Sequence, residues 1–573
     1  MSVEALLAWN DRQRALVGGW LEWRQEHDLL AEGLACSLLA ELPRYRAEAA
    51  GRKPHVPAEK VPVKARAPVE VWQEEVSEEL TEQDNLLVHE MVARACQAAA
   101  EAQEEVEART VAQAAAEAEA RAKTEAKARA TAQAEARARE VVAPASSKPV
   151  AKAPTEEETA KWLDSLDRPQ PPLDVGEQGE FAGSSTADDG SEVGVRCRFA
   201  SVSHIGGSGK NRQKENQDAM FVVRGERTMV WGVLDGHGPD NGRLAAHGGV
   251  RAFKAWFAEH EVELESDPQV AMTSAFRAAH DAIRQLMVTR YERQGEPLKT
   301  TAGGYLVGEE GEPVDGGATA TLAALVHGHL LVIANVGDSD ALLGGKLPDG
   351  TIGFEQLCAD HSPTSADEFV RVQRFGAQQV DDAWEPPLFA YTAGDEPLEI
   401  FAVGADGTVE LDPEALRQLD ETGAGYKTAR GDRPTAVVAT ETREYEECQL
   451  GVTRSLGDFY LQHFGVTWEP SVSCIDLLDM RAQLEQVTLV IASDGLWDLW
   501  QYKDVLQYPL GKPPPANSGA VLAPLLELVE ETRSQGEELF GDSADNITVV
   551  TITVAFGESA SQPAAPVEEV LFC

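Results

Sequence analysis

The sequence has few basic residues compared with acidic ones. Its 573 residues include 50 Lys and Arg against 96 Asp and Glu, which gives a formal net charge of −46 at pH 7. Proteins that bind nucleic acid or anionic membrane surfaces depend largely on Lys and Arg. The composition therefore argues against both kinds of partner, whereas a strongly acidic chain attracts cations, metal ions included.

Cysteine and long apolar runs are also scarce. The 7 cysteines are scattered and none forms a Cys-x-x-Cys pair, which is typical of a reducing compartment where thiols are packing residues. No run approaches the roughly 20 apolar residues of a membrane span, and the first residues lack the pattern of a secretory signal. No basic localisation run stands out, so we expect an intracellular protein that is cytoplasmic, nuclear or both.

The N-terminal third of the chain predicts helices. Leucines recur at helical spacing near the start, so we expect a helical N-terminal region over 1–60. This region is either a hairpin that packs on itself or a docking or dimerising element. Residues 86–141 alternate Ala with charge and often place Glu four positions before Lys or Arg, which predicts a solvated helix that acts as a spacer.

Composition indicates the remaining boundaries. Residues 142–192 are rich in Pro, Ser, Gly and acids, which predicts a disordered, flexible linker with one short helix around 155–166. Residues 193–556 have the composition of a globular domain, and the tail 557–573 is expected to be disordered. Several regions are expected in any case, because single hydrophobic cores stop growing near roughly 250–300 residues.

Inside the domain, strand-like apolar runs repeatedly meet an aspartate. Asp235 follows the run 229–234, Asp338 and Asp494 follow similar runs, and Asp545 comes just before one. A turn is the simplest interpretation of any one Asp-Gly pair. Several carboxylates gathered without Lys or Arg repel one another unless a metal ion offsets their charge. Taken together, the aspartates favour a site for a hard divalent cation.

Short motifs in this domain follow an order that resembles a known family. They are KENQDAM (214–220), DGHG (235–238), GGATATLA (316–323), ANVGDSDA (334–341), ADHSP (359–363), VTRSLGD (452–458), ASDGLWD (492–498) and DNITVV (545–550). The chain resembles the metal-dependent serine/threonine protein phosphatases of type 2C over roughly 195–556. The resemblance implies an α+β fold with four α-β-β-α layers, in which an antiparallel β-sandwich is flanked by helices.

The resemblance also implies a centre of two Mg²⁺ or Mn²⁺ ions. Asp235 would bridge both ions, with the carbonyl of Gly236 on one of them and Asp494 and Asp545 on the other. Asp218 would act through water bound to a metal. A third, looser metal site would use Asp338 and Asp498.

The implied activity is hydrolysis of phosphoserine and phosphothreonine in phosphoprotein substrates by a metal-activated water. Asp235 would stand at the catalytic centre, and no covalent phospho-enzyme is needed. His237 is the candidate general acid for the departing Ser or Thr oxygen, and a structural loop histidine is the alternative. The N-terminal helices are a possible attachment site for a protein partner.

One departure from the family pattern concerns the group that binds substrate phosphate. The family usually carries a basic residue five positions before the aspartate that matches Asp218. Gln213 stands there in this chain, flanked by Arg212 and Lys214. We expect Arg212 to bind the phosphate, with Lys214 as the alternative.

Two further departures leave the activity open. Gln217 stands where Glu is frequent, and Asp340 stands where Arg is usual. The loss of that Arg removes either a cation near the metal ions or a structural ion pair. A catalytically weak scaffold with an N-terminal interaction module, an oligomerising N-terminal third that carries the phosphatase as cargo, and a small-phosphoester hydrolase are the alternatives.

The segment of about 383–440 is longer than the usual flap of the family. It is expected to contain a strand at IFAVG, a turn at 405–407 and a short helix near 413–422. Because flap loops border the active site in the family, the segment either selects substrates or is a plain surface excursion.

Overall fold

The computed structural model describes residues 155–558 with short internal gaps. The gaps are 187–191, 208–213, 302–304, 377–385, 393–396, 405–406, 424, 440–447, 482–483, 485 and 512–520. The chain divides into two compact units, Met1–Lys148 and Pro149–Cys573, and the described residues belong to the second. The expected N-terminal helices and the tail beyond 558 lie outside the described residues. No helix in the described part has the length and hydrophobicity needed to cross a membrane.

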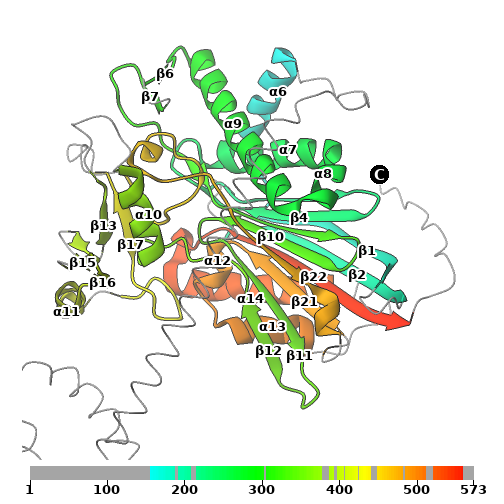
Figure 1. Ribbon diagram of the computed structural model, residues 1–573. Helices are drawn as coiled ribbons and strands as arrows, with labels where there is room; N and C mark the ends of the chain where they lie inside the picture. The colour runs from blue at the N-terminus through cyan, green and yellow to red at the C-terminus, as the bar shows by residue number, and fades with distance from the viewer. Residues whose placement is uncertain are drawn as a thin grey trace, which may run out of the picture. The chain divides into compact units, whose positions relative to one another are not determined.

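Two antiparallel sheets form the middle layers of the domain (Figure 1). The six-stranded sheet has the order β1 (Leu173–Thr186), β2 (Glu192–His204), β22 (Ile547–Glu558), β21 (Gln486–Ala492), β11 (Asp340–Lys346) and β12 (Ile352–Gln356). The five-stranded sheet has the order β20 (Ser471–Asp476), β10 (Leu330–Val336), β9 (Ala320–Val326), β4 (Thr228–Leu234) and β3 (Ala219–Arg224). Central strands such as β4 are buried along their whole length, which explains their continuous apolar runs.

Helices cover both outer faces. The five-stranded sheet packs against α7 (Gly242–Glu259) and α9 (Pro268–Gln294), with α8 (Glu261–Ser266) between them in sequence. The six-stranded sheet packs against α13 (Tyr502–Gly511) and α14 (Leu522–Phe540). The result is the four-layer α-β-β-α sandwich that the sequence predicts (Figure 1).

The space between the sheets is filled by side chains from both. Trp231 of β4 is fully buried and meets Phe199 of β2 edge to face, with ring centroids 5.6 Å apart. Leu, Ile and Val side chains from β9, β10, β21 and β22 complete the same cluster. This core fixes the distance between the sheets and therefore the positions of the strand ends.

Short elements complete the domain. A three-stranded sheet joins β5 (Gly236–His237), β8 (Gly317–Ala318) and β19 (Leu456–Gly457), and a separate pair joins β6 (Lys299–Thr300) and β7 (Leu306–Val307). The other short helices are α10 (Ala366–Gly376), α12 (Asp494–Trp497), η2 (Leu461–Phe464), η3 (Leu477–Met480) and η5 (Gly541–Ser543).

The domain begins earlier than the sequence indicates. Helix α6 (Glu156–Leu166) occurs where the short helix is expected, with Thr155 and Glu158 forming a capping box. Its Leu163 joins the core of the helix layer, and β1 pairs with β2 from Leu173 to Thr186. The prediction of a flexible linker is therefore wrong for 173–186. Gly, Ser and acidic residues make up much of β1, an edge strand with little side-chain packing, and that composition resembles a linker.

The flap insertion forms a small folded unit. Its four-stranded sheet contains β14 (Leu398–Glu399), β13 (Leu388–Tyr391), β17 (Thr435–Val438) and β18 (Gln449–Leu450). The expected strand is β15 (Phe401–Val403), which pairs with β16 (Val409–Leu411), and the expected helix is α11 (Pro413–Thr422). A separate hydrophobic cluster that includes Phe389, Ile400 and Leu419 supports it.

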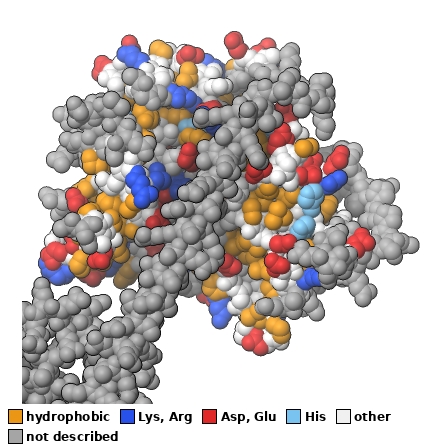
Figure 2. Space-filling view, viewed as in Figure 1, with side chains coloured by type: hydrophobic (Ala, Val, Ile, Leu, Met, Phe, Trp, Pro, Cys, Tyr) orange, Lys and Arg blue, Asp and Glu red, His pale blue; other side chains and the backbone are white. Residues whose placement is uncertain are grey.

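The face of the molecule seen in Figure 1 carries acidic, basic and apolar side chains interspersed (Figure 2).

Candidate metal centre and active site

Aspartates converge where strands of the two sheets end. Asp235 directly follows β4, and Asp218 directly precedes β3, which is the neighbour of β4. In the other sheet, Asp494 follows β21 after one residue, and Asp545 precedes the adjacent β22. Antiparallel neighbours place the end of one strand beside the start of the next, so the topology itself gathers these carboxylates.

Two glycines allow the connecting loops to come together. A Cβ on Gly236 would lie 2.3 Å from the carbonyl oxygen of Gly242 and 2.7 Å from that of Gln217. A Cβ on Gly495 would lie 1.9 Å from the carbonyl oxygen of Asn546. The glycine after each aspartate is therefore required by backbone approach, which is the physical reason for the repeated Asp-Gly pairs.

The first set of carboxylates, here called the Asp235 group, consists of Asp218, Asp235 and Asp545. Desolvation and the charge of Asp545 raise the pKa of Asp218 to about 7. Desolvation and Asp494 raise the pKa of Asp545 to about 6, and desolvation with the surrounding carboxylates raises that of Asp235 well above its usual value. The common direction means that this group lacks enough nearby positive charge to favour its ionised form.

Two carboxylate oxygens in the cluster have no hydrogen-bond partner. Oδ1 of Asp218 and Oδ1 of Asp494 are both buried and unsatisfied within the described part of the chain. The other oxygen of Asp218 accepts a hydrogen bond of 2.7 Å from the Ser493 hydroxyl, which fixes the direction of the carboxylate. Buried acceptors without donors are unfavourable, and oxygen ligands of this kind suit Mg²⁺ or Mn²⁺. The residues present therefore fit a divalent cation.

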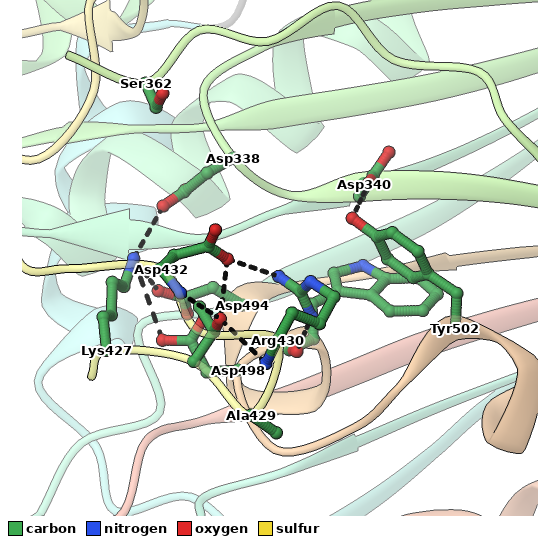
Figure 3. Close-up of polar contacts among 12 residues, drawn as sticks. Asp338, Asp340, Ser362, Lys427, Ala429, Arg430, Asp432, Asp494, Asp498 and Tyr502 are labelled. Atoms are coloured by element: carbon green, nitrogen blue, oxygen red, sulfur yellow. Dashed lines mark hydrogen bonds and ion pairs between the residues drawn. The ribbon is translucent and has the colours of Figure 1, made fainter. Parts of the chain in front are cut away.

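The second set, here called the Lys427 group, consists of Lys427 with Asp338, Asp494 and Asp498. The ammonium nitrogen of Lys427 lies 2.9 Å from Asp338, 3.3 Å from Asp494 and 3.8 Å from Asp498 (Figure 3). The charge of Asp338 above all raises the pKa of Lys427. Desolvation opposes ionisation of Asp494, but Lys427, Asp235 and His237 together outweigh it, so the pKa of that carboxyl is lowered.

The cluster is not yet arranged as a formed coordination shell. Among the described residues, no set of three or more acidic, histidine or cysteine side chains stands ready to hold a metal ion. Desolvation and Asp494 raise the pKa of Asp498 to about 8 even with Lys427 nearby. The ionised form of Asp498 therefore needs more positive charge than Lys427 provides.

The side chain of His237 is oriented by Asp458. Its Nε2 lies 2.7 Å from Oδ2 of Asp458, which also accepts a hydrogen bond from the Ser455 hydroxyl. Burial lowers the pKa of His237, but the charge and hydrogen bond of Asp458 outweigh this effect, so the pKa lies above its usual value. An imidazolium oriented in this way next to Asp235 can donate a proton.

The positions that depart from the family pattern have distinct surroundings. Gln217 donates a 2.8 Å hydrogen bond to the carbonyl of Gly238, and Lys214 donates to the carbonyl of Ala544. Asp340 accepts hydrogen bonds from the Tyr502 hydroxyl at 2.9 Å and from Gln356 at 2.6 Å. Asp340 is thus a structural acceptor. Arg212 and Gln213 lie outside the described residues.

Sequence reasoning missed two residues of this site. Asp458 belongs to the VTRSLGD motif, but its partner is 221 residues away and no spacing rule pairs them. Lys427 lies in the flap insertion, 89 residues from Asp338, and its surrounding sequence KTARGD contains no recognisable motif. The VTRSLGD motif was a weak sign that Asp458 has a role in the site, whereas no feature of the sequence indicated Lys427.

Part of the chain is similar to known protein phosphatases. The sequence model of the family described as "Protein phosphatase 2C" matches residues 230–381 and 439–508. "Probable protein phosphatase 2C 65" of Arabidopsis thaliana is 24% identical over 353 residues, which are 56% of this chain and 73% of that relative. "Probable protein phosphatase 2C 33" of the same plant is 23% identical over 350 residues, which are 55% of this chain and 60% of the relative. The matched part thus falls short of the full length of both relatives.

Among solved structures, the serine-threonine phosphatase 2C from Toxoplasma gondii aligns at a TM-score of 0.40 with 19% identity, over 68% of this chain and 100% of that chain. The family match covers the strands and helices that carry Asp235, Asp338, Asp494 and Asp498. Over these residues the chain is thus similar to the family described as "Protein phosphatase 2C".

Proposed function

We propose that this chain dephosphorylates phosphoserine and phosphothreonine in proteins with two divalent ions, Mg²⁺ or Mn²⁺, held by its converging aspartates. The match of residues 230–381 and 439–508 to the protein phosphatase 2C family supports a metal-dependent serine/threonine phosphatase in general. The observation that carries the specific assignment is the pair of buried, unpartnered oxygens on Asp218 and Asp494 in the described part of the chain. These two atoms lie in a cluster in which desolvation and neighbouring carboxylates raise the pKa values of Asp218, Asp235 and Asp545.

Each residue of the centre has a separate task in this proposal. Asp235, the carbonyl of Gly236, Asp494 and Asp545 would together hold the two ions. Asp218 is kept in place by the Ser493 hydroxyl and orients water beside the ions. Divalent ions bound at such a cluster lower the pKa of water and neutralise phosphoryl oxygens.

His237 is the proposed general acid. Its Asp458 partner raises its pKa, so the ring carries a proton to give to the departing Ser or Thr oxygen. Asp458 acts as a positioning residue, because its carboxylate contacts the imidazole and the Ser455 hydroxyl. The reaction therefore needs no covalent intermediate on the protein.

The test is phosphate release by the full chain from a phosphothreonine peptide, with Mn²⁺, with Mg²⁺ and with EDTA. Asp494→Asn should abolish the metal-dependent turnover, while the exposed Asp504→Asn on α13 should retain it. Turnover that survives EDTA or Asp494→Asn would refute the proposed centre. Metal binding without turnover on any peptide would favour the catalytically weak scaffold, and turnover on p-nitrophenyl phosphate alone would favour a small-phosphoester hydrolase.

A further inference from the structure

Lys427 comes from a part of the chain that the family model does not match. The matched segments end at residue 381 and resume at 439, so the folded flap insertion between them is additional to the family pattern. From this insertion, Lys427 reaches three aspartates of the sandwich (Figure 3). Its side chain keeps 37% of its surface exposed, so part of it faces solvent.

The backbone around Lys427 is fixed to the sandwich on one side. The backbone N–H of Ala429 donates to the carbonyl of Asp498 at 2.7 Å, and Gln501 donates to the carbonyl of Ala429 at 2.8 Å. Within the turn, the N–H of Lys427 donates to the carbonyl of Asp432 at 2.7 Å. These bonds hold the root of the Lys427 side chain next to the aspartates, whatever the ammonium binds.

Arg430 strengthens this attachment. Its guanidinium donates to the carbonyl oxygens of Trp497 and Trp500 and lies 4.7 Å from the centre of the Tyr502 ring. The Tyr502 hydroxyl in turn donates to Asp340, the residue that stands where the family usually has Arg (Figure 3). Tyr502 and Arg430 therefore connect Asp340 to the flap insertion.

The position of Lys427 has a direct consequence for cation binding. A divalent ion needs carboxylate oxygens at roughly 2.0–2.6 Å, and the ammonium already pairs with one oxygen of each of the three aspartates. The ammonium and a divalent ion would repel each other on the same oxygens, so the ion can bind them only if the ammonium moves away. A group tethered this closely competes at a local concentration on the order of millimolar.

We propose that Lys427 is a built-in cation that holds Asp338, Asp494 and Asp498 together and competes with a divalent ion for their oxygens. This inference rests on the proposed metal-dependent function and adds a residue that sets how much metal the centre requires. It assigns the flap insertion a role in metal occupancy, separate from any contact with substrate. The ion pairs of Lys427 within the described residues are with these three aspartates and not with Asp218 or Asp545, so its effect should fall on ions that use Asp338, Asp494 or Asp498.

The main test is binding of Mn²⁺ to the full chain after EDTA treatment and removal of the chelator, measured by calorimetry and by the electron spin signal of free Mn²⁺. Lys427→Met removes the charge and keeps the length of the side chain, and it should bind one Mn²⁺ on the order of tenfold more tightly than the wild type. Lys427→Arg keeps a positive charge and should retain weak binding. The exposed Lys503→Met on α13 is the matched control and should behave as the wild type.

A second measurement needs no variant. Amine-reactive labelling followed by peptide mass spectrometry should show that labelling of Lys427 rises when Mn²⁺ is added, while that of Lys503 stays constant. Equal Mn²⁺ affinity in wild type and Lys427→Met, or labelling that does not respond to Mn²⁺, would overturn the proposal. A raised KM for phosphopeptide with unchanged Mn²⁺ affinity would also overturn it, because Lys427 would then be a phosphate-binding group.

The same data separate this inference from the proposed function. If Mn²⁺ binds and supports turnover but Lys427→Met changes neither affinity nor labelling, the phosphatase assignment stands and the competition does not. If neither wild type nor Lys427→Met binds Mn²⁺, both fail together. A variant that loses its fold is recognised by circular dichroism, and the labelling experiment on the wild type then decides.

Discussion

The Asp235 group and the Lys427 group lie at the same end of the sandwich but differ in the source of their positive charge. Within the described residues, only the Lys427 group is joined to a cation by ion pairs. The carboxyl pKa values of the Asp235 group are all raised. In the Lys427 group the pKa of Asp494 is lowered, with Lys427 as the largest favourable contribution, while desolvation still raises that of Asp498. The chain therefore supplies a cation of its own to one part of the cluster and leaves the other part dependent on cations from solution.

The largest expected effect is on catalysis when the Asp235 group is broken. Asp235→Asn removes a carboxylate proposed to hold metal and should lower phosphatase turnover by about 10³-fold or more, since metal ions contribute several kcal/mol at such centres. In EDTA, however, the variant should unfold at a higher temperature than the wild type, because a carboxylate repelled by its neighbours is lost. Turnover assays test the loss of activity, and calorimetric melting in EDTA tests the rise in unfolding temperature.

Glu368 contrasts with the Asp235 group, because basic side chains of the chain itself pair with its carboxylate. It is 4% exposed, forms ion pairs with Arg454 and Arg371, and accepts a 2.8 Å hydrogen bond from Thr453. Glu368→Gln should destabilise the domain by about 3 kcal/mol, because two largely buried guanidinium groups lose their partner. Urea unfolding measures this change, and an unchanged midpoint would contradict the contrast with Asp235→Asn.

A steric change should disturb both groups together. Gly495→Ala places a methyl group 1.9 Å from the carbonyl oxygen of Asn546 and must push the Asp494 and Asp545 loops apart. We expect a stability loss of about 2 kcal/mol, typical of an inserted carbon in a packed site. Mn²⁺ affinity should fall as well. Gly557→Ala, which has open space around its Cβ, is the control and should change neither property.

Two buried histidines give the smallest expected effect, on the pH dependence of stability. Burial lowers the pKa of His280 and of His361 to about 3. The unfolded chain therefore binds more protons between roughly pH 6.5 and pH 3, so stability is complete above that window and falls as the pH drops through it. Each histidine should contribute a slope of about 1.4 kcal/mol per pH unit. Urea unfolding between pH 7 and pH 5 should show a smaller slope for His361→Gln.

The sequence was sufficient for elements whose pattern is local. The runs before Asp235 and Asp494 predict β4 and β21, and the proline start and glycine end of the 413–422 segment predict α11. The order of motifs also identifies the aspartates that the fold brings together. Strand β1 escaped prediction because its composition is that of a linker and its stability comes from pairing with β2.

Long-range partners are the part of the site that local reasoning cannot supply. Lys427 meets its aspartates 67 and 89 residues away only because Arg430 and Ala429 attach its turn to the sandwich. Asp458 reaches His237 because β19 and β5 both pair with β8. Such contacts follow from tertiary packing, which no periodicity in one segment encodes.

The pairing of β1 with β2 has a practical consequence for anyone who wishes to isolate the phosphatase domain. Composition suggests cutting the chain near Val193, but that cut would remove β1 and leave β2 as the sheet edge. The backbone groups of β2 that pair with β1 over Glu192–His204 would then face solvent. A long, open strand edge invites other chains to add to it, so such a fragment should aggregate. A fragment that begins at Pro149 retains this protective strand and should remain monodisperse.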